Sequence, residues 1–230
     1  MKQEATLTPA RLKAPRAAAI AGILFAVLLI AGLGLFQLSA RADPLETGAW
    51  LKTSANRVAL ALNLVPFAGI AFLWFMGVLR DRLGELEDRF LATVFLGSGL
   101  LFLAMLFASA AVVGGIIIAY TARPERLLDS ATLTFARALT YEIMNLYAVK
   151  MAGVFMISTS TLAIRTGFVP RWIAFVGFAF ALLLLLSGRN VDWIIMVFPL
   201  WALLISIYIL IANLRQPSQA AATSPGQKSP

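Results

Sequence analysis

The chain consists of six long apolar blocks separated by short polar joints. The blocks cover residues 17–38, 58–79, 90–120, 141–164, 170–186 and 193–214. A helix needs about 20 apolar residues to cross the roughly 30 Å hydrocarbon core of a bilayer. The pattern therefore predicts an all-α fold, a polytopic transmembrane helix bundle with six spanning helices.

The joints are too short to form a separate soluble domain. We therefore expect one membrane domain over residues 17–214, with a basic cytoplasmic tail at 1–16. Residues 215–230 are rich in Pro, Ser, Ala and Gln, a composition typical of disorder. We expect these residues to form a disordered cytoplasmic tail.

The first block has two interpretations. Ala40-Arg41-Ala42 matches the small-residue cleavage site of a secretory signal peptide. The apolar stretch that precedes it is longer than the usual signal core of about 7–15 residues. We interpret the block as a first spanning helix, with removal as a signal peptide as the alternative.

The third block is the longest, and as a helix its 31 residues would measure about 46 Å. It is expected to tilt, protrude or break, and Gly114-Gly115 is the expected point of breakage. Small residues recur along one face and would let a neighbouring backbone approach closely. This predicted helix-packing face consists of Gly97, Ala104, Ala108, Ala111 and Gly115.

The fourth block contains Lys150, the only ionisable side chain well inside a predicted span. A lysine at this depth costs several kcal/mol unless it finds water or a partner. The candidate partners are the carbonyl freed near Pro66, the amide of Asn63, and Glu142. The predicted polar track or ligand site comprises Lys150, Glu142, Asn145, Asn63, Ser160 and Thr161. The alternative is a structural anchor, with the ammonium extended toward the outer headgroups.

Local signals place both ends of this fourth helix. Asp129 or Ser130 is a suitable N-cap for a helix that continues into the block. Gly167 is a suitable C-terminal stop, because glycine readily adopts the left-handed conformation found there.

The composition excludes several chemistries. The sequence has no cysteine and no histidine, which rules out disulfides, thiolate metal sites, bis-histidine haem and histidine-based zinc chemistry. No nucleotide-binding or calcium-binding motif is present. We therefore expect no enzyme, no metal and no cofactor. A lipid-modifying enzyme that uses Lys150 with a serine stays open as a third, weaker hypothesis.

Charge predicts the orientation and the kind of partner. The net charge is +8, but the basic residues are scattered over tails and joints, so we expect no nucleic-acid partner. With the N-terminus in the cytoplasm, the inner segments would hold eleven lysines and arginines and the outer joints seven. Because basic residues concentrate on the cytoplasmic side, both termini are predicted to lie there.

Two segments, Arg57–Ala108 and Asn145–Arg171, resemble an uncharacterised family of bacterial multi-pass membrane proteins. The densely charged turn between the second and third blocks is the most distinctive part. The resemblance implies an integral protein of the bacterial inner membrane. The family has no assigned activity, so it assigns no functional residue.

Together these features favour a non-enzymatic membrane component that binds a partner protein or lipid. Membrane lipids are the expected partners, with a partner membrane protein or a second copy of the chain as further candidates. The alternative function is a small transporter or channel whose polar track follows the Lys150 face.

Overall fold

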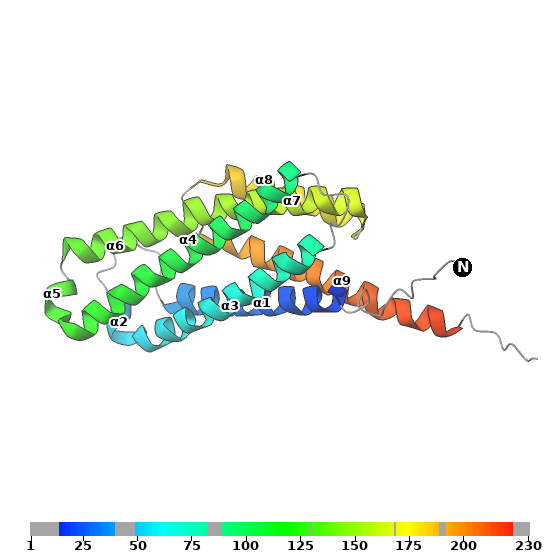
Figure 1. Cartoon of the computed structure of the whole chain (residues 1–230). Coiled ribbons are helices and arrows are strands. Elements are labelled where there is room, and N and C mark those ends of the chain that lie inside the picture. The colour runs from blue at the N-terminus through cyan, green and yellow to red at the C-terminus, as the bar shows by residue number, and fades with distance from the viewer. Residues whose placement is uncertain are drawn as a thin grey trace, which may run out of the picture.

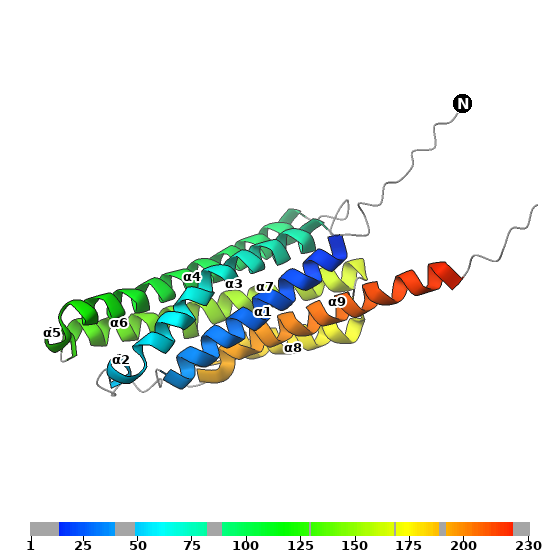
Figure 2. The ribbon, with the colours of Figure 1, turned by 90° about the horizontal axis from the view of Figure 1, so that it is seen from below.

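The computed structural model is an elongated bundle of helices that run side by side (Figures 1 and 2). It describes residues 14–39, 49–81, 89–128, 130–167, 169–188 and 192–222, and within these ranges there is no strand. The first helix begins and the last helix ends at the same end of the bundle (Figure 1). The predicted all-helical architecture is confirmed.

The elements follow the predicted blocks in order. They are α1 (Ala14–Ser39), α2 (Ala49–Thr53), α3 (Ala55–Asp81), α4 (Arg89–Ala122), α5 (Pro124–Leu128), α6 (Ala131–Glu142), the π-helix η3 (Ile143–Ala148), α7 (Val149–Thr166), α8 (Arg171–Leu186), the 3₁₀-helix η4 (Asp192–Met196) and α9 (Val197–Ala222). α6, η3 and α7 form one continuous helical stretch from Ala131 to Thr166.

Five of the helical stretches are long and apolar enough to cross a membrane. These are Ala17–Ser39, Ala55–Arg80, Arg89–Ala122, Ala131–Thr166 and Trp193–Leu214. The fifth predicted span corresponds to α8, which has 16 residues and is about 24 Å long. It is apolar but shorter than the hydrocarbon core.

The expected break in the third block does not occur. α4 continues without interruption through Gly114 and Gly115 and has 34 residues, about 51 Å of helix. Glycine lowers helix propensity by only about 1 kcal/mol, and continuous backbone hydrogen bonding outweighs this cost in an apolar helix. α4 is therefore one straight-through helix that is longer than the roughly 20 residues needed to cross a bilayer.

The predicted packing face of α4 does not pack within the chain. Ala104, Ala108, Ala111 and Gly115 are exposed and Gly97 is half-buried. The buried residues of α4 are Phe95, Ser98, Gly99, Phe102, Leu103, Leu106, Ser109, Val113 and Ile116. Large side chains fill the space between α4 and its neighbours, whereas the small residues leave the opposite surface open.

A cluster of aromatic rings joins the helices at the centre of the bundle. Phe72 of α3 has ring contacts with Phe25 of α1, Phe102 of α4, Phe155 of α7 and Phe198 of α9, with centroids 4.6–5.8 Å apart. All five rings are fully buried. One side chain of α3 thus connects four other helices.

The predicted helix boundaries are confirmed at two positions. The Ser130 hydroxyl accepts a hydrogen bond from the Leu133 amide at 3.2 Å, which caps α6. Gly167 has a φ of 67° and ends α7. At the C-terminus, α9 continues past Leu214 to Ala222, so the expected disordered tail is helical over its first residues. Residues 1–13, 40–48, 82–88 and 223–230, which include the candidate cleavage site, lie outside the described residues.

Candidate functional site

A cavity of about 360 Å³ lies between the α1–α3 pair and the α4–α6–η3 group. Of these helices, α6 lies in the half of the bundle that is remote from the start of α1 (Figure 2). Trp50 of α2 and Ile195 of η4 also line the cavity. Its volume falls in the range of about 300–1,000 Å³ that is typical of ligand pockets.

The cavity is about as deep as one leaflet of a bilayer. Its lining residues on α4 run from Leu106 to Ile116, which is about 15 Å of helix. The hydrocarbon core of a bilayer is roughly 30 Å thick. The long axis of the cavity therefore matches half of that thickness.

The two sides of the cavity differ in chemistry. The α1–α3 side is mainly apolar, with Gln37 as a polar residue near the end of α1, and includes Leu28, Leu29, Leu33, Leu62, Val65 and Ala68. The α6–η3 side presents Thr134, Arg137, Tyr141 and Asn145 at spacings of three and four residues. Such spacings place side chains on one helical face. A polar stripe thus faces an apolar wall along the length of the cavity.

Ser109 of α4 adds a hydroxyl to the cavity lining. The residue is only 6 % exposed, and its hydroxyl makes no hydrogen bond to any described residue. Ser98, also buried on α4, instead donates to the Val94 carbonyl at 2.6 Å. Hydroxyls inside helices usually form this bond to the preceding turn. The Ser109 hydroxyl is therefore available to a molecule in the cavity.

Ser109 and Tyr141 lie at about the same height along the bundle. The antiparallel helices α4 and α7 are in register where Phe95 stacks on Phe155, with ring centroids 4.8 Å apart. Ser109 lies fourteen residues after Phe95 on α4, and Tyr141 lies fourteen residues before Phe155 on the continuous stretch of α6, η3 and α7. Ser109 and the middle of the polar stripe therefore line the cavity at similar heights.

The π-helix η3 forms the end of this stripe that lies next to α7. Met144 and Asn145 line the cavity from this segment, and the Asn145 side-chain amide donates to the Tyr141 carbonyl at 3.3 Å. π-helical segments are rare and occur frequently at functional sites. The irregular turn borders the cavity at the point where α6 continues into α7.

The structure divides the predicted polar track among separate places. Glu142 and Asn145 line the cavity. Asn63 is exposed in a second groove between α3 and α4. The Thr161 hydroxyl donates to the Ile157 carbonyl at 2.9 Å, and the buried Ser160 hydroxyl has no hydrogen-bond partner.

Lys150 belongs to α7, and its side chain reaches the C-terminal end of α8. Its ammonium donates to the carbonyl oxygens of Leu184, Leu185 and Ser187 at 3.0, 2.7 and 2.8 Å. These partners differ from all three that the sequence suggested. The last carbonyls of a helix lack partners within the helix and carry partial negative charge. The ammonium donates to these carbonyls, of which that of Leu184 also accepts from the Ser187 hydroxyl at 2.8 Å.

Several residues of the cavity were not predicted as site residues, namely Gln37, Trp50, Ser109, Arg137 and Tyr141. Ser109 had a usable signal, since it follows Phe102 and Leu106 at helical spacing on the face that proves to be buried. The others belong to joints or ends of blocks. Their convergence depends on how the helices pack.

The described residues contain no group of three or more acidic, cysteine or histidine side chains that could hold a metal ion. The chain matches no family model, no curated protein and no solved structure. The family resemblance of the two sequence segments therefore stays a prediction.

Proposed function

We propose that the protein is a non-enzymatic membrane component that binds an amphipathic lipid in the cavity between α1–α3 and α4–α6–η3. The observation that supports this proposal is the contrast between the two sides of the cavity. A lipid chain would pack on the apolar wall, while its polar group would contact the stripe of Arg137, Tyr141 and Asn145. Ligand pockets typically combine apolar walls with a few placed polar groups.

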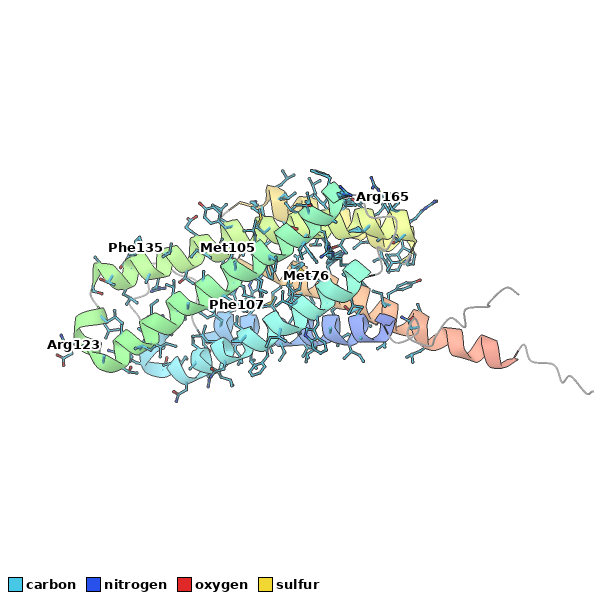
Figure 3. All side chains as sticks on the ribbon, in the orientation of Figure 1. Met76, Met105, Phe107, Arg123, Phe135 and Arg165 are labelled. Atoms are coloured by element: carbon cyan, nitrogen blue, oxygen red, sulfur yellow. The ribbon has the colours of Figure 1, made fainter. Side chains whose placement is uncertain are left out.

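The membrane arrangement in this proposal has six spans in the bacterial inner membrane, with both termini in the cytoplasm. Arg123 and Arg165 lie at opposite ends of the bundle (Figure 3), as expected of a protein whose charged ends contact the two headgroup regions. α8 would be the fifth span in chain order and would complete the set of six, with Lys150 donating to the carbonyls at its end. Reporter fusions to the two termini test this orientation, and reporters on opposite faces of the membrane would contradict it.

Co-purification tests lipid binding directly. The full chain is purified in a mild detergent, and its bound lipids are measured by native mass spectrometry. Ala138 is exposed and borders the cavity, so Ala138→Trp should fill the opening without disturbing the core. We expect this variant to lose the bound lipid.

The matched control is Leu139→Trp, on the same helix but outside the cavity lining. It should retain lipid at the level of the unmodified chain. Equal lipid binding by both tryptophan variants would contradict the proposed function.

A small transporter with a polar track along the Lys150 face remains the alternative proposal. It would require the ammonium to leave three carbonyl oxygens that lie within 3.0 Å. Transport through this face predicts that Lys150→Met abolishes activity without loss of stability. The contacts at α8 favour lipid binding with Lys150 as an anchor.

The small-residue face of α4 is the proposed contact for a partner membrane protein or a second copy. Its support is that Ala104, Ala108, Ala111 and Gly115 are exposed, so a neighbouring helix would meet little steric hindrance. Ala108→Leu should then change the oligomeric state in detergent, whereas an unchanged state would remove this proposal.

A further inference from the structure

We infer that the lipid in the cavity is a single-chain acyl glycerophospholipid, whose ester carbonyl accepts a hydrogen bond from Ser109. This inference rests on the proposed function and specifies the ligand of the same site. It starts from Ser109, a buried residue that lines the cavity and whose hydroxyl makes no hydrogen bond to any described residue. The hydroxyl is open to the cavity, so a carbonyl oxygen of a ligand there can accept its hydrogen bond.

The position of Ser109 indicates which part of the ligand it contacts. Ser109 lies at the height of Tyr141, and Arg137 is four residues nearer the start of α6, about 6 Å along the axis. In a glycerophospholipid, a short glycerol backbone separates the phosphate from the ester carbonyl. A phosphate near Arg137 would therefore place a carbonyl near Ser109.

The side chains of Arg137 and Ser109 suit a phosphate and a carbonyl, respectively. Arginine has five donors in a planar fork and binds phosphate well even when it also contacts another residue. A serine hydroxyl donates readily to a carbonyl oxygen. Between Ser109 and the central aromatic cluster the lining is mainly apolar, with Leu28, Leu29 and Leu106. A hydrocarbon chain would pack there.

The size of the cavity favours a ligand with one chain. Its volume of about 360 Å³ lies near the lower end of the range of about 300–1,000 Å³ that is typical of ligand pockets. A second chain would have to lie outside the cavity.

The test compares two probes that differ only in the carbonyl. One is a lysophospholipid with an ester-linked chain, and the other is its ether-linked analogue with the same chain and headgroup. Binding of each probe to the full chain is measured by native mass spectrometry in detergent. We expect the ester probe to bind more tightly, and Ser109→Ala to lower its affinity roughly 2- to 12-fold. The affinity of the ether probe should not change.

Ser98→Ala is the matched control, since Ser98 is a buried serine of α4 that bonds within its own helix and does not line the cavity. It should leave the binding of both probes unchanged. Equal affinities for ester and ether, unaffected by Ser109→Ala but abolished by Ala138→Trp, would overturn this inference and leave the proposed function intact. Binding that is insensitive to Ala138→Trp as well would overturn both.

Discussion

The ammonium of Lys150 lies 2.7 Å from the carbonyl oxygen of Leu185, although the two residues belong to different helices. Two further carbonyls of the same helix end, those of Leu184 and Ser187, accept from the same ammonium. The last carbonyls of a helix lack partners within the helix. Lys150 supplies a donor to those of Leu185 and Ser187, while the Leu184 carbonyl also accepts from the Ser187 hydroxyl at 2.8 Å.

Lys150→Met is expected to destabilise the protein by about 2–4 kcal/mol, because the carbonyls of Leu185 and Ser187 lose this donor in a part-buried environment. Thermal unfolding in detergent measures the change. Lys52→Met is the control, since Lys52 is an exposed lysine of α2 and its replacement should have little effect. Equal stability of the two variants would contradict the role of Lys150 as an anchor.

α8 is expected to cross the membrane despite its length. The sequence has no cysteine, so a single introduced thiol reports one position without background. Arg171→Cys lies at the first residue of α8 and Gly188→Cys lies just after its end, and both original residues are exposed. A membrane-impermeant maleimide should label Gly188→Cys on intact cells and Arg171→Cys only on inverted vesicles. Labelling of both from one side would show that α8 does not span the bilayer.

Phe72→Ala is expected to destabilise the bundle by about 3–5 kcal/mol, the usual cost of removing a fully buried aromatic side chain. Its ring contacts rings from α1, α4, α7 and α9, so the resulting cavity would be shared by four helices. Phe67→Ala, on the same helix at a position that is 62 % exposed, should cost far less. Chemical or thermal unfolding of the two variants gives the comparison, and similar losses would argue against a central aromatic core.

Gly177→Ala is expected to destabilise the contact of α8 with α7 and α9 by about 1–3 kcal/mol. A methyl group at this glycine would collide with the Ser160 hydroxyl and with the indole of Trp201. Gly97→Ala is the control, because a methyl group there meets open space and should be neutral or slightly stabilising in a helix. Adding Ser160→Gly to Gly177→Ala should restore part of the lost stability. If the double variant is no more stable than Gly177→Ala, the collision is not the cause.

The local features of the chain were predictable from its sequence. Each membrane-spanning helix satisfies its backbone hydrogen bonds within its own segment, so an apolar block of sufficient length indicates a helix without knowledge of its neighbours. The same holds for Ser130 and Gly167, whose capping roles depend on the adjacent turns. These features require only local information.

The faces and partners of the helices were decided by tertiary packing. α4 is apolar on all sides, so its pattern of residues does not identify a buried face. The small residues drew attention to one side, but the large side chains of the other side, including Phe102 and Leu106, fill the core. In a uniformly apolar helix, rotation about its axis is fixed by the shapes of its neighbours.

The candidate site was likewise predictable from the sequence only in part. The sequence alone indicated Glu142, Asn145 and Lys150 as polar groups within or beside a span. Packing placed the first two at the cavity and joined Lys150 to carbonyls 34 to 37 residues away. It also left the Ser109 hydroxyl without a partner among the described residues. Composition and local capping signals determined roughly where the helices begin and end. Distances between side chains of different helices depend on register and rotation, and only the folded bundle specifies them.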